Sequence, residues 1–300
     1  MIAPADERTT STRAAVVRLL RPRQWVKGVL VLAAPAAAGV LHEPGVLAET
    51  ALAFVAFSLA ASGTYCLNDA SDVESDRAHP TKRFRPVAEG SVSVAAARLL
   101  GIGLLVGSVA VAAVAGGWRL PLVILGYVAL TTSYTVWLKH IAVVDLAAVA
   151  AGFVLRAIAG AVATDVEVSD WFLIVASFGS LFMVAGKRSA ELGEEGEVSS
   201  HRRVLSMYSA AYLTYVRSVA SGVTLLAYTL FAFEKADLSA AAIPWFELSI
   251  VPFGLAILRY AQRLDQGAGG APEDVVLRDR ALQVLGLCWA VLAAIGVYTT

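Results

Sequence analysis

One asparagine and three aspartates lie close together in the segment from Leu67 to Arg77: Asn68, Asp69, Asp72 and Asp76. If the segment is helical, the three aspartates fall at positions i, i+3 and i+7 and share one face. Carboxylates stacked in this way repel one another unless a cation lies between them. Their oxygens suit Mg²⁺, which typically leaves positions for water and substrate phosphate. The spacing therefore indicates a site for a divalent metal and a pyrophosphate, and the alternative is a solvated acidic helix end.

A basic run follows this acidic segment, with Lys82, Arg83 and Arg85 between Pro80 and Pro86. A metal-bound pyrophosphate needs cations on the oxygens that the metal does not hold, and Lys and Arg supply them. The two prolines stiffen the loop and would fix the cations in place. The same run also serves as a positive anchor at a membrane surface, and the two roles are compatible.

Further cations lie near the ends of apolar segments elsewhere in the chain. Arg21, Arg23 and Lys27 precede the first apolar segment, where they suit either anionic lipid head groups or a substrate phosphate. Two more groups, at the ends of later segments, are Tyr134 with Lys139 and Lys187 with Arg188. These groups could converge on one site with the acidic segment, although spacing alone does not establish that they do.

Arg156 differs from these cations because it lies deep in an apolar segment, between Gly152 and Gly160. A charge at that depth is costly and must face the protein interior, and glycines allow helices to approach closely. A structural hydrogen-bonding role and a direct ligand contact both stay open for Arg156, and the same holds for Arg217.

The amino-acid composition indicates whether the protein that positions these residues lies in water or in a membrane. Of the 300 residues, 58% are apolar and only 16% are charged, against about 25% charged in soluble domains, and the mean hydropathy is +0.68. Such a chain cannot cover a water-facing surface, so we predict an all-α membrane protein. The net charge of zero gives no reason to expect a nucleic-acid partner.

A membrane-spanning helix needs about 20 mostly apolar residues, and nine segments meet that rule. They are 25–42, 47–67, 92–115, 119–138, 141–163, 170–187, 208–233, 243–262 and 280–298. The first is the weakest because Lys27 lies near its start and Pro35 in its middle. We expect one transmembrane domain over residues 1–300, with a tight turn at Lys139-His140.

The distribution of Lys and Arg predicts the orientation of these segments. A cytoplasmic N-terminal segment 1–24 places nearly all the loop cations on the cytoplasmic side, and only Arg119 and Lys235 on the other. The three longer hydrophilic stretches, 68–91, 188–207 and 263–279, then also face the cytoplasm. Because longer loops tend to carry function, we expect a cytoplasmic active site in a multi-pass protein of the inner (plasma) membrane.

The pattern Asn68-Asp69-x-x-Asp72-x-x-x-Asp76 resembles the NDxxDxxxD motif of the UbiA superfamily of intramembrane prenyltransferases. The nine predicted helices, Tyr134-x-x-x-x-Lys139 and the glycine-rich segment around Arg156 agree with it, so the resemblance covers essentially the whole chain. It implies the superfamily's helical fold and binding of a pyrophosphate substrate through Mg²⁺ on two Asp-rich motifs.

The chain departs from that pattern at the second motif, where Lys187-Arg188-Ser189-Ala190-Glu191 replaces a carboxylate pair. This favours direct binding of phosphate groups over a second metal. Together with the stretches 21–35, 76–86, 171–192 and 272–280, it resembles the actinobacterial branch that acts in arabinogalactan (cell-wall arabinan) synthesis. That branch implies 5-phosphoribosyl 1-pyrophosphate as donor, decaprenyl phosphate as acceptor, pyrophosphate as leaving group and Mg²⁺ as cofactor, and it is compatible with a homo-oligomer.

On this hypothesis Asp72 and Asp76, with Asn68 or Asp69, hold Mg²⁺ on the pyrophosphate. The expected substrate-binding residues are Arg21, Lys27, Lys82, Arg83, Arg85, Tyr134, Lys139, Lys187 and Arg188. An aromatic prenyltransferase that uses a polyprenyl pyrophosphate is the first alternative, and it requires the missing second acidic motif. A transporter or a membrane scaffold is the other, and it predicts no Mg²⁺-dependent turnover.

Overall fold

The computed structural model describes residues 12–194, 205–239, 241–268 and 272–299, and it is helical without a β-strand in these ranges. Its residues form two compact units. Of the described residues, unit 1 comprises 12–29 and 51–128, and unit 2 comprises 30–50 and those between 129 and 299. Arg8, Arg202 and Arg203, which are among the loop cations that the Lys and Arg distribution assigns to the cytoplasmic side, lie outside the described residues.

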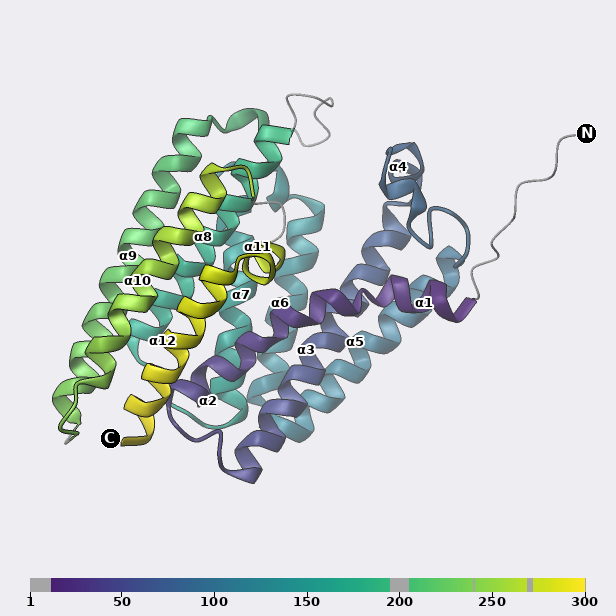
Figure 1. Cartoon of the computed structure of the whole chain (residues 1–300). Coiled ribbons are helices and arrows are strands. Elements are labelled where there is room, and N and C mark those ends of the chain that lie inside the picture. The colour runs from purple at the N-terminus through teal and green to yellow at the C-terminus, as the bar shows by residue number, and fades with distance from the viewer. Residues whose placement is uncertain (1–11, 195–204, 240, 269–271, 300) are drawn as a thin grey trace, which may run out of the picture. The chain divides into compact units, whose positions relative to one another are not determined.

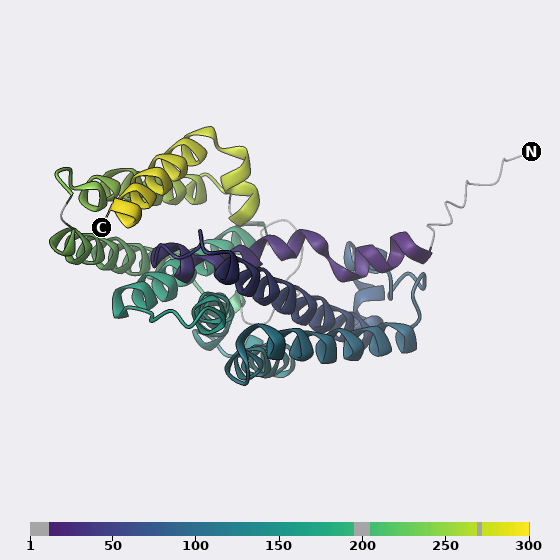
Figure 2. The ribbon, with the colours of Figure 1, turned by 90° about the horizontal axis from the view of Figure 1, so that it is seen from below.

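Unit 1 takes its helices from the first half of the chain. They are α1 (Thr12–Leu20), the start of η1 (Pro22–Leu32), most of α3 (Pro44–Ser71), α4 (Val73–Ala78), η2 (Lys82–Phe84), α5 (Val94–Gly116) and the start of α6 (Arg119–Val136). Helices α3 and α5 run side by side (Figures 1 and 2). They approach closely at Gly63 and Gly101, since a Cβ on Gly63 would lie 2.9 Å from the Gly101 carbonyl oxygen.

The polar end of unit 1 rests on a small apolar core. Leu19 of α1 packs there with Cys66 and Ala70 of α3 and with Val87 and Val92 of the following loop. The loop is therefore folded back onto the end of α3 by burial of its own apolar residues. This packing brings the basic run from Lys82 to Arg85 back toward the acidic segment.

Unit 2 holds the remaining helices. They are α2 (Ala33–Ala37), η3 (Leu138–His140), α7 (Val144–Ala163), α8 (Asp170–Glu194), η4 (Leu205–Met207), α9 (Ala210–Leu238), α10 (Trp245–Asp265), α11 (Pro272–Arg278) and α12 (Arg280–Thr299). Helix α8 packs against α7 and α9, and α10 against α9 and α12. In Figure 1, α7 and α8 are the teal ribbons of this unit, α9 and α10 the green ones and α12 the yellow one. Side chains on α8, α10, α11 and α12 meet in one core that includes Phe182, Leu264, Val275 and Leu282.

Two helix starts in this unit are capped by polar side chains. Ser209 accepts a hydrogen bond from the Tyr212 amide at the start of α9, as N-cap residues commonly do. Asp279 accepts one from the Leu282 amide at the start of α12, and Arg259 donates to the same carboxylate. The hydrogen bond from Arg259 holds the pKa of Asp279 below its usual value.

Seven helices in the described residues are long and apolar enough to cross a membrane: α3, α5, α6, α7, α8, α9 and α12. The multi-pass membrane class is confirmed, whereas the count of nine is not. The predicted segment 243–262 is helical as α10, but it carries Glu247 and Arg259 and is less apolar than the seven. The predicted segment 25–42 is not one helix, because its first part is 3₁₀ and only Ala33–Ala37, around Pro35, is α-helical.

Two predicted loops begin later than expected. Helix α3 continues to Ser71, so Asn68 and Asp69 belong to its last turn rather than to the loop 68–91. Helix α8 continues to Glu194, so Lys187 and Arg188 are helical rather than at the edge of the loop 188–207. The Arg188–Glu191 and Lys187–Glu191 pairs, three and four residues apart, support that extension. The tight turn at Lys139-His140 is confirmed as η3.

Candidate functional site

Two buried carboxylates and two arginines meet at the end of α3 in unit 1, and we call Arg21, Asp69, Asp76 and Arg85 the carboxylate cluster. Arg21 Nη2 lies 2.7 Å from Asp69 Oδ1. Arg85 Nη1 lies 3.2 Å from the same oxygen and 2.8 Å from Asp76 Oδ2. Arg85 thus bridges carboxylates from two helices, and the two positive charges balance the two negative ones.

The cluster has the donor chemistry of a site for a hard cation. The side chains of Asp69 and Asp76 are 2% and 4% exposed. Asp69 Oδ2 is buried and has no hydrogen-bond partner, which is costly for a charged oxygen unless a ligand reaches it. An unsatisfied carboxylate oxygen beside a second carboxylate fits Mg²⁺, which prefers oxygen ligands. The residues present therefore fit the metal that the sequence predicts.

The structure does not place all four predicted ligands in one group. The helix is interrupted at Asp72, which has φ −94° and ψ 11° and begins α4, so the predicted helix face is not continuous. Asp69 and Asp76 converge on Arg85, whereas Asn68 and Asp72 are half-buried beside them. Among the described residues, no group of three or more His, Cys, Asp or Glu side chains is arranged to hold a metal ion.

Arg21 is held in an uncommon conformation at this cluster. Its φ is +52°, a region that residues other than glycine rarely occupy and that recurs at functional sites. Its guanidinium lies 4.5 Å from the centre of the Tyr65 ring. Nearby, Ser62 accepts a hydrogen bond from Trp25 and donates one to the Leu20 carbonyl. These contacts tie the start of η1 to α3 and direct Arg21 toward Asp69.

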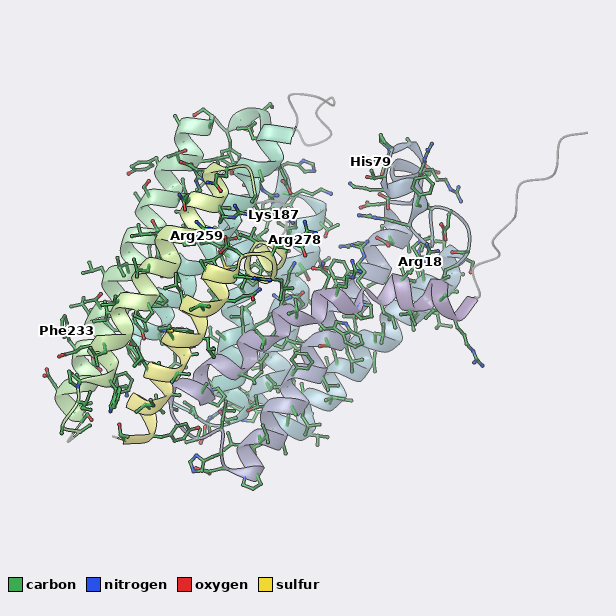
Figure 3. All side chains as sticks on the ribbon, viewed as in Figure 1. Arg18, His79, Lys187, Phe233, Arg259 and Arg278 are labelled. Atoms are coloured by element: carbon green, nitrogen blue, oxygen red, sulfur yellow. The ribbon has the colours of Figure 1, made fainter. Side chains whose placement is uncertain are left out.

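The other predicted cations of unit 1 are not part of the cluster. Lys82 and Arg83 lie on η2 with exposed side chains, and the Arg83 guanidinium lies 4.8 Å from the Phe84 ring centre. Lys27 donates to Gln24 at 2.6 Å. Figure 3 labels two further side chains of unit 1, Arg18 on α1 and His79, which directly follows α4.

A second polar group is buried in unit 2, and we call Tyr134, Asp145, Arg188, Glu191 and Tyr208 the Arg188 cluster. Arg188 donates through Nε to Asp145 Oδ2 at 3.1 Å, through Nη1 to Glu191 Oε2 at 2.7 Å and through Nη2 to the Tyr134 hydroxyl at 2.9 Å. Tyr208 donates to Asp145 Oδ1. All three guanidinium nitrogens are thus engaged by side chains from three helices.

Sequence reasoning predicted Tyr134 and Arg188 but missed Asp145 and Tyr208. Asp145 is fully buried. A lone carboxylate at the start of an apolar segment is energetically costly, so the argument that singled out Arg156 could also have found Asp145. Tyr208 gives no comparable signal because tyrosine is common at membrane interfaces. Burial raises the pKa of the Tyr208 hydroxyl, and the hydrogen bond to Asp145 raises it further. Tyr208 is therefore a neutral donor at physiological pH.

The two predicted lysines of unit 2 are not buried in the Arg188 cluster. The side chain of Lys187 is 41% exposed, and its Nζ lies 4.0 Å from Glu191 Oε1. Lys139 lies half-buried on η3. In unit 2 Lys187 precedes Arg188 on α8, and Arg259 and Arg278 are further cations of the unit (Figure 3).

The two arginines with open roles both contact protein groups. Arg156 donates to the Gly152 carbonyl at 2.6 Å and lies over the Phe153 ring. Arg217 donates to Thr214 and to Asp265. Arg156 thus bonds to a carbonyl of its own helix, whereas the buried Nε of Arg217 has no hydrogen-bond partner among the described residues.

The sequence is similar to known proteins over nearly its whole length. Residues 28–278 match the model of the UbiA prenyltransferase family. The chain is 47% identical to a decaprenyl-phosphate phosphoribosyltransferase of Mycobacterium tuberculosis, over 94% of this chain and 93% of that one. It is 46% identical to the protein of that name from Corynebacterium glutamicum, over 94% of this chain and 86% of that one.

The fold is similar to that of solved structures at much lower identity. A UbiA homolog from Archaeoglobus fulgidus bound to DMAPP and Mg²⁺ matches with a TM-score of 0.69 at 19% identity, covering 95% of this chain and 98% of that one. An apo UbiA homolog from Aeropyrum pernix matches with a TM-score of 0.60 at 15% identity, covering 96% and 98%. The helical arrangement therefore extends across distant relatives.

Proposed function

The chain belongs to the UbiA prenyltransferase family, and from this premise we propose that it is a decaprenyl-phosphate phosphoribosyltransferase. It transfers the 5-phosphoribosyl group of 5-phosphoribosyl 1-pyrophosphate to decaprenyl phosphate, giving decaprenylphosphoryl-5-phosphoribose and pyrophosphate. The observation that carries this function is identity of 46–47% over 94% of the chain to proteins of that name. Such identity makes a shared activity the best-supported assignment.

The carboxylate cluster is the site for the donor pyrophosphate. Asp69 and Asp76 would hold Mg²⁺, with Asn68 and Asp72 as the further oxygen ligands that the sequence supplies next to them. When bound, the metal supplies positive charge on the pyrophosphate leaving group. The orphaned Asp69 Oδ2 supports this assignment, since a bound cation would satisfy it.

Arg85 and Arg21 are the cations that the cluster itself provides. In the structure both are bonded to Asp69. A cation bound by Asp69 and Asp76 would compete with them for the carboxylates, and the arginines would then be available to pyrophosphate oxygens. Lys82 and Arg83 are exposed on the same loop and would reach the phosphates from solvent. Arg–phosphate pairs are strong and directional, which suits this positioning role.

The reaction breaks the bond between ribose C1 and the pyrophosphate oxygen and forms a bond from C1 to an oxygen of the lipid phosphate. The nucleophile is already an anion at neutral pH, so no strong general base is needed. The electron pair of the broken bond leaves with pyrophosphate, whose charge the basic residues stabilise. Repulsion between the two polyanionic substrates is the main barrier to bringing them together, and the many cations serve to reduce it.

The basic residues of unit 2 take a further phosphate group. Lys187 is accessible, and Lys139 lies on the neighbouring turn before α7. Arg188 is buried and engaged by two carboxylates, so it acts with Lys187 rather than as an isolated cation. The active site and the N-terminus face the cytoplasm of the inner (plasma) membrane, as the distribution of Lys and Arg indicates.

Incubation of the purified chain in detergent with labelled 5-phosphoribosyl 1-pyrophosphate, decaprenyl phosphate and Mg²⁺ tests the proposal. We expect label in the lipid fraction, loss of the product on chelation with EDTA and recovery on adding Mg²⁺. A parallel incubation with a polyprenyl pyrophosphate and an aromatic acceptor should give no product. Prenylation of the aromatic acceptor without ribosylation of the lipid would contradict the assignment and favour an aromatic prenyltransferase.

A further inference from the structure

The two carboxylates on Arg188 differ sharply in their surroundings. Asp145 is fully buried on α7, whereas the side chain of Glu191 is 23% exposed on α8. Asp145 contacts the Nε side of the guanidinium, and Glu191 contacts the Nη1 side. A ligand that arrives from solvent can therefore replace Glu191 but not Asp145.

Asp145 is itself held in place by Tyr208. The Tyr208 hydroxyl donates to Asp145 Oδ1 and accepts a hydrogen bond from the Val143 amide at 2.7 Å. Val143 has φ +69°, which is strained for a β-branched residue and persists only where the surroundings fix it. One hydroxyl thus fixes both the partner of Arg188 and the turn that follows Lys139.

Glu191 lies where an anion would be bound by two cations. One carboxylate oxygen is 2.7 Å from Arg188 Nη1, and the other is 4.0 Å from Lys187 Nζ. With Asp145 and Glu191 ionised, the four charged side chains have no net charge. A phosphate group would be bound only if one of these carboxylates gave up its position, and the partly exposed Glu191 can do so at lower cost than the fully buried Asp145.

We propose that Glu191 occupies the position of a substrate phosphate on Arg188 and Lys187, and that Tyr208 and Asp145 are positioning residues for this phosphate subsite. The proposal deepens the proposed function and rests on it. A phosphate group binds by displacing the Glu191 carboxylate toward solvent, while Asp145 and Tyr208 keep Arg188 in place. The Glu191 charge therefore weakens binding, and the Tyr208 hydroxyl strengthens it.

Two mild substitutions with opposite expected effects test this. Glu191→Gln should lower the apparent KM for one of the two substrates about threefold to tenfold, because an uncharged amide competes less well with phosphate. Tyr208→Phe should raise the apparent KM for the same substrate about threefold to tenfold, the range of one ordinary hydrogen bond, because Tyr208 acts on Arg188 only through Asp145. Separate titrations of 5-phosphoribosyl 1-pyrophosphate and decaprenyl phosphate identify which phosphate binds there. The kcat should change little in either variant.

Matched controls separate this role from a general effect on folding. Tyr212 stacks on Tyr208 with ring centres 5.7 Å apart, and Asp265 is an exposed carboxylate of the same unit. Tyr212→Phe and Asp265→Asn should leave both KM values unchanged. Equal KM values in wild type and Glu191→Gln, or a lower melting temperature of Tyr208→Phe without a change in KM, would overturn the proposal.

A binding measurement distinguishes failure of this inference from failure of the proposed function. If the wild type does not turn over these substrates, the proposed function fails, but inorganic pyrophosphate still probes the subsite. Calorimetric titration should then show tighter pyrophosphate binding by Glu191→Gln than by wild type. Equal or weaker binding by that variant would overturn the subsite independently of the reaction.

Discussion

At the scale of single residues, burial separates the cations of this chain into two kinds. Arg85 and Arg188 are each bonded to two carboxylates, whereas Lys82 and Arg83 are exposed on a short loop helix. Arginines of the first kind hold a polar cluster together. They become available to a ligand when one of their carboxylate partners is displaced. Those of the second kind attract polyanions with little change in the surrounding structure.

The carboxylates of the first cluster should be essential for transfer. Asp76→Asn should lower the rate of lipid ribosylation by about a hundredfold or more, as removal of a key charge-stabilising group commonly does. Glu74→Gln, on the same helix α4 and exposed, is the matched control and should retain the wild-type rate. Initial rates and melting temperatures of both variants give the comparison. A rate within twofold of wild type for folded Asp76→Asn would contradict the metal assignment.

At the scale of helices, hydropathy predicted the membrane segments better than it predicted their ends. Helices α3 and α8 both extend through polar residues that hydropathy had assigned to loops. The sequence supplied the residue types of the carboxylate cluster, but not its pairing. Arg85 reaches Asp69 only because Val87 and Val92 fold the loop back onto α3. Asp145 and Tyr208 were missed because their partnership joins residues 63 positions apart.

One close backbone contact in unit 2 depends on Gly160, where there is no room for a side chain. A Cβ on Gly160 of α7 would lie 1.8 Å from the backbone oxygen of Val31. Gly160→Ala should therefore destabilise the protein by about 1–3 kcal/mol, the usual cost of overpacking. In Gly222→Ala the new methyl group meets no atom within 4 Å, so helix propensity should keep or raise stability. Equal melting temperatures for the two variants would contradict this packing.

At the scale of the whole molecule, each polar cluster is complete within one compact unit. The carboxylate cluster draws all its side chains from unit 1, and the Arg188 cluster draws all of its side chains from unit 2. One cluster contains carboxylates with an unsatisfied oxygen, and the other contains an arginine with an exchangeable carboxylate.

In the proposed reaction, pyrophosphate leaves ribose C1 and the lipid phosphate is the nucleophile. The most direct test uses donor labelled with ³³P in the 5-phosphate and ³²P in the terminal phosphate of the pyrophosphate. After incubation with decaprenyl phosphate, we predict ³³P in the lipid fraction and ³²P in water-soluble pyrophosphate, in equal molar amounts. Transfer of ³²P to the lipid, or lipid without ³³P, would contradict the claim.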